Sequence, residues 1–186
     1  MSLIVEALEI PDIKRVTPSR FSDARGFFSE TYNAERFQAA GIPAMFVQDN
    51  HSFSEKAGTV RGLHFQAPPF AQAKLVRVLR GAILDVAVDV RRASPTYGKW
   101  VKAELNAQNG AQLFVPQGFL HGFVTLEAET EIAYKVDNYY SKVSDGAVLW
   151  NDPDLAIDWG LSNDQASLSE KDAAAQRFAE FDSPFA

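Results

Sequence analysis

Apolar and polar residues alternate with a period of two along much of the chain, which is typical of β-strands. In residues 84–90, four aliphatic side chains occupy one face, and Asp, Ala and Asp occupy the other. Residues 100–105 repeat this pattern, and the apolar run 73–80 ends at Gly81, where we expect a tight turn into the next strand. Further strands are expected over residues 27–32, 46–54, 112–116, 119–125 and 131–138. Roughly ten short strands at regular spacing predict an antiparallel sandwich or barrel.

Two segments carry helix signals instead. Asn33 is a suitable N-cap for a helix over Ala34–Ala40, which Gly41 would end. A second helix is expected from Glu170 to Phe181, with Ser169 as its cap. The prediction is therefore an all-β fold, a jelly-roll β-sandwich with a few short peripheral helices.

Length and composition narrow the possibilities further. No repeat, low-complexity tract or linker divides residues 1–186, so we expect a single domain. The net charge of −6 argues against broad nucleic-acid binding, which needs a basic face. Cysteine is absent, which excludes disulfides and thiolate metal sites and fits a reducing compartment. With no apolar run of membrane-spanning length and no signal-peptide pattern, we expect no membrane segment and a cytoplasmic location.

His64, one of three histidines, is the first candidate for chemistry. A positioned histidine titrates near neutrality and can remove a proton from a carbon beside a carbonyl group. A lone histidine on a strand is more often a hydrogen-bonded structural residue. Arg61 would face the opposite side of a regular strand, but Gly62 between them can break that regularity and let both side chains reach one pocket.

Lys74 and Tyr134 lie on two other expected strands. A cation at Lys74 could stabilise an enolate oxygen or hold a phosphate, although a lysine at a strand start is more commonly a surface residue whose stem packs on the sheet. Tyr134 shares a face with Ile132 and Val136, where a buried phenol is the ordinary interpretation. The functional interpretation is an acid on the side of a substrate opposite His64.

His121 follows Pro116 and Gly118 with the spacing of the second conserved box of cupin sandwiches, where the histidine is normally a metal ligand. Such a metal site also needs two histidines one residue apart and a nearby glutamate in the first box. This chain has His64-Phe65-Gln66 there. Metal binding is therefore the weaker interpretation.

Asp172 lies at the third helical position of the capping box Ser169-Glu170-Lys171-Asp172, which alone explains its identity. It can also orient the second ring nitrogen of a histidine, as carboxylates do in catalytic dyads. Several other polar or aromatic residues near strand ends have ordinary turn or edge roles when taken alone: Arg25, Glu30, Gln48, Asn50, Tyr139 and Tyr140.

Taken together, these segments resemble the dTDP-4-dehydrorhamnose 3,5-epimerase family over roughly residues 20–175. The matching pieces occur in family order and are Asp23-x-Arg25-Gly26-x-Phe28-x-Glu30, Gln48-Asp49-Asn50-x-Ser52, Arg61-Gly62-Leu63-His64-Phe65-Gln66, Gln72-x-Lys74-Leu75-Val76, Gly81-x5-Ala87-Val88-Asp89-Val90-Arg91, Pro116-x-Gly118-Phe119-x-His121-Gly122-Phe123, Tyr134-x5-Tyr140, Trp150-x-Asp152-Pro153 and Leu168-Ser169-Glu170-Lys171-Asp172. The joint pattern is highly specific, although no single piece would be.

The resemblance implies a homodimeric, metal-free jelly roll of cupin type. It also implies inversion at the two carbons that flank the 4-keto group of dTDP-4-dehydro-6-deoxy-D-glucose. No redox step is required, so no nicotinamide or other cofactor is expected, and the sequence has no glycine-rich dinucleotide fingerprint.

The same resemblance implies roles for individual residues. His64 would be the base, with Asp172 as its dyad partner, Lys74 would stabilise the enolate, and Tyr134 would return a proton from the opposite face. The nucleotide-sugar, mainly its diphosphate, would be held by Arg25, Glu30, Gln48, Asn50, Arg61 and His121, with Tyr140 stacking on thymine. Just before Gly146, where the family often has a glutamate that contacts substrate, this chain has Asp145, which we expect to take that contact.

Three alternatives stay open from the sequence. A related nucleotide-sugar epimerase that inverts only one centre is the main rival, and the presence of Tyr134 favours the double epimerase. A metal-dependent cupin is disfavoured by the incomplete first box. A non-catalytic sugar-binding cupin is disfavoured because the base, acid and cation positions are all filled.

Overall fold

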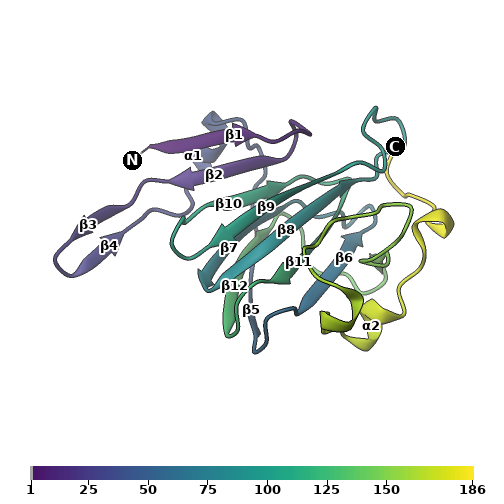
Figure 1. The fold of residues 1–186 in the computed structure, drawn as a ribbon. Helices are drawn as coiled ribbons and strands as arrows, with labels where there is room; N and C mark the ends of the chain where they lie inside the picture. Colours follow the sequence, from purple (N-terminus) through teal and green to yellow (C-terminus); the bar gives the residue numbers. More distant parts are fainter. Residues whose placement is uncertain (1) are drawn as a thin grey trace.

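Strands make up most of the regular structure in the computed structural model, which describes residues 2–186 (Figure 1). One sheet has the order β1 (Leu3–Ala7), β2 (Lys14–Pro18), β10 (Gln112–Val115), β7 (Lys74–Arg80), β12 (Thr130–Val136) and β5 (Gln48–Ser54). The second has the order β13 (Asp145–Ala147), β6 (Val60–Gln66), β11 (Phe119–Thr125), β8 (Ala82–Asp89) and β9 (Trp100–Asn106). All strand pairs within these sheets are antiparallel, so the jelly-roll β-sandwich is confirmed.

The inner faces of the two sheets enclose an apolar core at one end and a polar pocket at the other. Side chains that point inward alternate along each strand, as the pleat requires. On β8 and β11, for example, Ile83, Ala87 and Phe123 belong to the inner core, which also includes Val76 and Ile132 of the facing sheet. A charged residue can therefore share an inward-facing row with core residues, as Asp85 of β8 does with Ile83 and Ala87.

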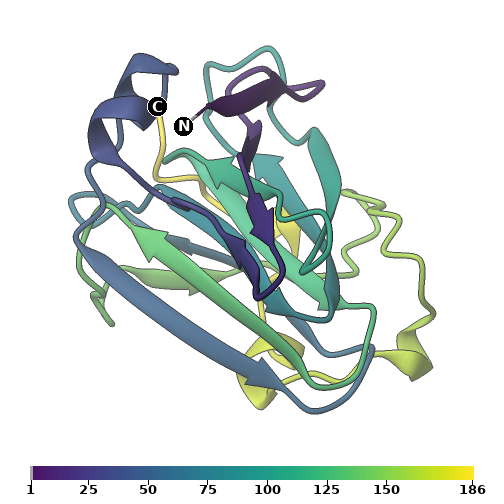
Figure 2. The same ribbon diagram turned by 90° about the vertical axis from the view of Figure 1, so that its left-hand side faces the viewer.

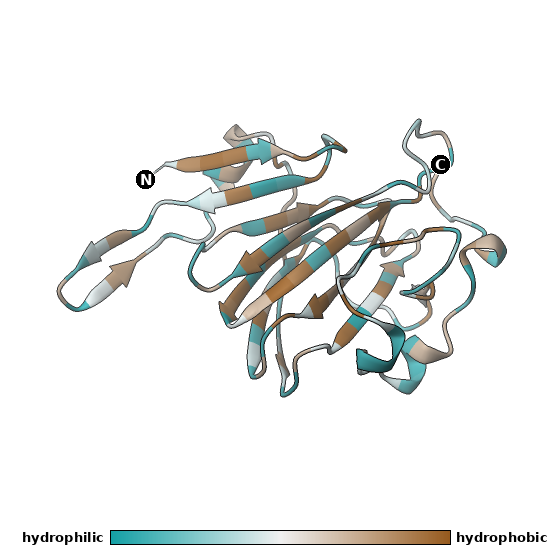
Figure 3. Ribbon diagram, in the orientation of Figure 1, coloured by the Kyte–Doolittle hydropathy of each residue, from teal (hydrophilic) through white to brown (hydrophobic). Residues whose placement is uncertain are grey.

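The outer faces of both sheets are also covered. The C-terminal segment lies over the five-stranded sheet, where Trp150, Trp159 and Phe181 pack against the aliphatic face of β8. On the six-stranded sheet, Phe37 of α1 and Ile42 cover part of the outer face. Figure 3 shows the resulting concentration of apolar residues in the central strands, and Figure 2 shows the segments around them from the side.

Because both outer faces are covered, the expectation that residues 84–90 have one solvent-facing side is wrong. The alternation there predicts one apolar face, with the Asp-Ala-Asp face as its polar opposite. Both faces are buried instead, and Asp85 and Asp89 are fully inaccessible to solvent. Val86, Val88 and Val90 face the C-terminal segment, whereas Asp85 points between the sheets.

The helices are short: α1 (Ala34–Ala39), α2 (Glu170–Ala173) and the 3₁₀ helices η1 (Asn163–Gln165) and η2 (Phe178–Glu180). The first helix and its Asn33 cap are confirmed, since the Asn33 side chain accepts a hydrogen bond from the Arg36 backbone N–H. Among residues 2–186, no helix has the length and apolar character needed to cross a bilayer.

The helix predicted over Glu170–Phe181 is wrong beyond Ala173. Ser169 does cap it, but tertiary contacts then draw the chain into an extended path. Gln176 forms a parallel bridge with Val148, and the Asp152 carboxylate accepts a hydrogen bond from the Phe178 backbone N–H. Long-range pairing of the backbone outweighs the local helix propensity here.

Strand boundaries also differ from the predictions near the N-terminus. The strand expected over residues 27–32 is only β4 (Gly26–Phe28), because its partner β3 (Phe21–Asp23) is three residues long. This hairpin projects from the body of the molecule at the left of Figure 1. The strands β1, β2, β3 and β13 were not expected from the alternation.

Gly62 interrupts β6 at the point where it meets β11. The pairing register of these strands shifts between His121 and Phe123, and Gly62 has a φ of 140°. A Cβ at this position would lie 2.5 Å from the Gly122 Cα. The two glycines therefore allow a close backbone approach. The side chains of Arg61 and His64, on either side of it, both line one pocket.

Replacing Gly62 with alanine should destabilise the fold through both backbone strain and this contact. Gly26→Ala is the matched control, since Gly26 has a φ of 137° but nothing within 4 Å of the added Cβ. The φ strain alone costs about 1–3 kcal/mol, so Gly62→Ala should lower the free energy of unfolding by clearly more than Gly26→Ala. Denaturant titration of both variants measures the difference, and equal losses would contradict the close approach.

Candidate active site

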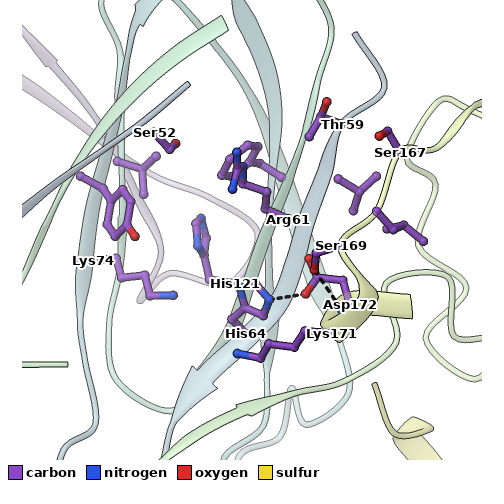
Figure 4. A pocket seen from close by; sticks show the side chains of 15 residues that line it. Ser52, Thr59, Arg61, His64, Lys74, His121, Ser167, Ser169, Lys171 and Asp172 are labelled. Atoms are coloured by element: carbon purple, nitrogen blue, oxygen red, sulfur yellow. Dashed lines mark hydrogen bonds and ion pairs between the residues drawn. The ribbon is translucent and has the colours of Figure 1, made fainter. Parts of the chain in front are cut away.

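A pocket of about 390 Å³ opens between the two sheets beside a second hollow of about 460 Å³. The two adjoin, because His64, Lys74, Tyr134 and Lys171 line both. We call the first the inner pocket and the second the mouth. Figure 4 shows the inner pocket, with Lys74, His121 and His64 lying across it.

His64 and Asp172 form a close pair at one side of the inner pocket. His64 projects from β6, and its Nε2 donates a hydrogen bond to Asp172 Oδ1 at 2.5 Å. The cap of α2 fixes Asp172, which is 3% exposed, because its backbone N–H bonds to the Ser169 hydroxyl. Burial raises the pKa of Asp172, but the hydrogen bond and charge of His64 outweigh it and bring that pKa below its ordinary value. Asp172 therefore stays ionised and leaves His64 Nδ1 as the ring nitrogen free for the pocket.

Lys74 and His121 form the floor of the inner pocket. His121 is buried, and its Nε2 donates to Asp85 Oδ1 at 2.5 Å, while the second oxygen of Asp85 has no hydrogen-bond partner. Burial lowers the pKa of His121 against the raising effect of Asp85. Burial also lowers the pKa of Lys74 to about 8, and the charges of Asp85 and Asp145 limit that fall. At neutral pH the floor thus offers an ammonium group and an imidazole: the imidazole is bonded to Asp85, and the charge of the same carboxylate favours the ammonium form of Lys74.

Tyr134 stands on the wall opposite His64. It lies on β12 in the six-stranded sheet, whereas His64 lies on β6 in the five-stranded sheet. Burial raises the pKa of Tyr134, partly offset by the charge of Arg61. The phenol therefore stays protonated near neutral pH and can act as a proton donor.

Arg61 lines the inner pocket together with His64, as the break at Gly62 allows. Its Nη2 donates to the Phe53 carbonyl at 3.0 Å and its Nε to the Ser54 hydroxyl at 3.4 Å. These neutral acceptors orient the guanidinium without cancelling its charge, so it remains available to an anionic ligand.

Polar and aromatic residues surround the mouth. Gln48 and Asn50 of β5 line it and bond to each other, with Gln48 Nε2 donating to Asn50 Oδ1 at 2.9 Å. Tyr140 exposes 59% of its surface there, and Asp145 forms an ion pair with Lys171. An exposed ring beside hydrogen-bonding groups and a lysine suits a nucleotide.

Arg25 and Glu30 are not part of either cavity of their own chain. Arg25 lies on the projecting hairpin, where its side chain is 90% exposed and pairs with Asp23. Glu30 pairs with Arg36 at 3.3 Å. That Arg25 and Glu30 bind the nucleotide-sugar stays a prediction. His121 lies on the pocket floor with Lys74, and its contact with the nucleotide-sugar also stays a prediction.

Two residues of the site were missed by sequence reasoning. Lys171 lines both cavities but was assigned only to a capping box. Asp85 was assigned to the polar face of an alternating strand, although a carboxylate flanked by Leu84 and Val86 in a strand covered on both faces signals a buried charge that needs a partner. In the part of the chain that the structure describes, no three His, Cys, Asp or Glu residues gather closely enough to hold a metal ion, and His51 lies outside the pocket, paired with Glu131.

The family follows from comparison with known proteins. Residues 7–180 match the family model described as dTDP-4-dehydrorhamnose 3,5-epimerase. The chain belongs to this epimerase family. The epimerases are isomerases, so the protein is an enzyme of that class.

Individual epimerases are similar over nearly their whole length. A dTDP-4-dehydrorhamnose 3,5-epimerase of Sinorhizobium fredii is 51% identical over 94% of this chain and 89% of its own. A solved structure of dTDP-6-deoxy-D-glucose-3,5-epimerase from Legionella pneumophila, in complex with dTDP-4-keto-L-rhamnose, has a TM-score of 0.93 at 43% identity and covers 97% of this chain and 95% of that one. A 3′-monoepimerase from Streptomyces bikiniensis in complex with dTDP-quinovose has a TM-score of 0.85 at 31% identity, with 93% and 87% covered.

The unusual acidity of Lys74 can be measured directly. With lysine labelled at ¹³Cε, the Lys74 signal should titrate with a pKa of about 8 rather than 10.5, because burial disfavours the ammonium. Lys74→Met identifies the signal by its loss. Asp85→Asn should lower the Lys74 pKa further, since the buried carboxylate favours the charged form. A Lys74 titration near 10.5 would contradict the buried floor.

Proposed function

We propose that the protein inverts C3 and C5 of dTDP-4-dehydro-6-deoxy-D-glucose and so forms dTDP-4-dehydro-L-rhamnose in dTDP-L-rhamnose biosynthesis. The observation that carries this proposal is the placement of His64 and Tyr134 on opposite sheets of one sandwich, with the inner pocket between them. Inversion at carbon needs removal of a proton on one face and delivery on the other. A base and an acid on facing walls meet that requirement.

His64 acts as the base through Nδ1, because Nε2 is bonded to Asp172. The Asp172 carboxylate fixes the ring orientation and stabilises the imidazolium that forms when the proton is taken. C3 and C5 both flank the C4 ketone, so the same chemistry applies to each. If the sugar ring turns within the pocket, its C3–H and C5–H bonds can face His64 one after the other.

Lys74 stabilises the enolate oxygen that develops at O4. Removing a proton next to a ketone becomes accessible near neutral pH when the new negative charge meets a preorganised cation. The position of His121 beside Lys74 supports a contact with the sugar oxygens rather than with the diphosphate. Asp85 bonds to His121, and its charge favours the ammonium form of Lys74.

Tyr134 then delivers a proton to the opposite face of the enolate. Its raised pKa suits this role, because the phenol is protonated before the transfer. The phenolate then takes up a proton from solvent, and His64 releases to solvent the proton that it gained, so both groups are reset and no external co-reactant is required. No cofactor enters this scheme.

The mouth binds the nucleotide end of the substrate. Lys171 at the mouth and Arg61 in the adjoining inner pocket supply positive charge for the diphosphate, and Tyr140 offers its exposed ring to thymine. Gln48, Asn50 and Asp145 contribute hydrogen-bonding groups at the same place. The cytoplasm is the location we propose, in agreement with the absence of cysteine.

Solvent exchange tests the base and the acid separately. In deuterated water, the enzyme should introduce deuterium at both C3 and C5 of the 4-keto sugar nucleotide, as NMR or mass spectrometry can show. His64→Ala should abolish exchange at both carbons. His51→Ala is the matched control, since His51 is exposed on the outer face of the sheet and should leave exchange unchanged.

Tyr134→Phe should separate exchange from inversion. His64 can still remove and return protons on its own face, so exchange should continue while formation of the inverted product falls by about 10²–10⁴-fold. Exchange at only one carbon in the wild-type enzyme would favour the single-centre epimerase, and binding without exchange would favour a sugar-binding cupin.

The second part of the proposal is a homodimer in which the hairpin of β3 and β4 reaches the mouth of the partner pocket. The hairpin carries Phe21, Phe27 and Phe28, each at least half exposed, on an arm that projects from the body (Figure 1). Such an apolar arm is expected to be buried against another chain. A partner chain would then supply the Arg25 and Glu30 contacts that the pocket lacks in its own chain.

Complementation tests this exchange of residues. Arg25→Ala and His64→Ala should each be weakly active or inactive alone. Mixed dimers formed by co-refolding should regain about one quarter of wild-type activity at low substrate, because half the dimers are mixed and each has one intact site. If Arg25 serves the pocket of its own chain, mixing will restore nothing.

A further inference from the structure

The exposed ring of Tyr140 is attached to a backbone that is fixed on both sides. The residues before and after it, Tyr139 and Ser141, are both bonded to one buried side chain, Gln66, which is 5% exposed. Gln66 Nε2 donates to the Tyr139 carbonyl at 3.2 Å, and its Oε1 accepts from the Ser141 N–H at 2.7 Å. A single glutamine side chain therefore forms hydrogen bonds with the backbone on both sides of Tyr140.

The same side chain also holds a second loop. Gln66 Nε2 donates to the Phe70 carbonyl at 2.7 Å, in the loop between β6 and β7. A glutamine amide offers two donors and an acceptor, and all of these functions are used here. Next to it, Asn138 donates to the Pro69 carbonyl at 3.1 Å, so the two loops are joined at more than one point.

A second glutamine completes the support from the other sheet. Gln48 Oε1 accepts from the Tyr140 backbone N–H at 3.3 Å. Gln48 projects from β5 and Gln66 from β6, which belong to different sheets. The segment that carries the exposed ring is thus held to both halves of the sandwich.

Gln66 lies two residues after His64 on the same strand. At this place a cupin metal site would have its second histidine, yet this side chain binds backbone groups of two loops instead. Among residues 2–186, no hydrogen bond joins Gln66 to His64 or Tyr134. Its three hydrogen bonds go to backbone groups of the two loops, and its side chain also lines the mouth.

We propose that Gln66 is a positioning residue for the nucleotide: it fixes the backbone around Tyr140 so that the exposed ring is preorganised to stack on the base. This inference rests on the proposed function, because it assumes that the mouth takes a nucleotide. An aromatic platform held in place loses little conformational freedom when a base stacks on it. Freeing the segment should weaken nucleotide binding and leave the chemistry at His64 intact.

Gln66→Met tests the inference, since methionine has a similar length but makes none of the three hydrogen bonds. Binding of dTDP alone, measured by calorimetry, should weaken on the order of tenfold. The KM for the sugar nucleotide should rise in parallel, while kcat and the deuterium exchange at saturation stay near wild type. Hydrogen exchange at the Ser141 amide should become faster.

Thr130→Val is the control. Thr130 is also a buried polar residue that holds a loop, through one bond from its hydroxyl to the Glu127 carbonyl at 2.8 Å, but it lines neither the inner pocket nor the mouth. It should lower the thermal midpoint without changing dTDP affinity. If Gln66→Met likewise lowers only the midpoint, Gln66 is structural and the inference is overturned.

The outcomes separate this inference from the function on which it rests. If the wild-type protein does not bind dTDP, the proposed nucleotide site is wrong. If the wild-type protein binds dTDP and Gln66→Met binds it equally well, only the positioning role is wrong. A fall in kcat without a change in KM would also contradict it, because that result would place Gln66 in the chemistry.

Discussion

The burial of charge between two sheets is the constraint on which the rest of this structure depends. Asp85 and Asp172 are nearly or fully inaccessible to water, and each accepts a hydrogen bond from a histidine at 2.5 Å. A buried carboxylate without such a partner would be strongly destabilising. The two histidines are in turn held in one orientation each, and they sit opposite one another in the pairing of β6 with β11. The need to satisfy buried charge therefore also produces an ordered pair of imidazoles.

Chemistry requires the sandwich to be open at one end, and the fold accommodates this by covering its outer faces. A pocket between the sheets reduces the apolar area that can be buried there. Tryptophan and phenylalanine residues of the C-terminal segment, and the segment around α1, bury further apolar area on the outer faces. The five-stranded sheet is consequently buried on both sides. This lets a hydrophobic strand such as β8 carry an aspartate toward the pocket.

How far the sequence predicts this arrangement depends on the range of the interactions. The alternation of apolar residues predicts the strands of the sandwich, and Asn33 and Ser169 predict where the helices begin, because these signals are local. The end of α2 could not be predicted, since it is set by a bridge to Val148. Lys74 and His64 were identified as candidates by residue type and family resemblance. The role of Asp85 was hidden because alternation cannot tell a solvent-facing row from a row that faces a cavity.

His64 and its partner carboxylate are 108 positions apart in the chain, one on β6 and the other in α2. The dyad therefore exists only while the segment around α2 is packed against the five-stranded sheet. A local opening of that segment would separate the carboxylate from the imidazole while the two sheets stay paired. Reactivity thus depends on the docking of one surface segment and not on the sandwich alone.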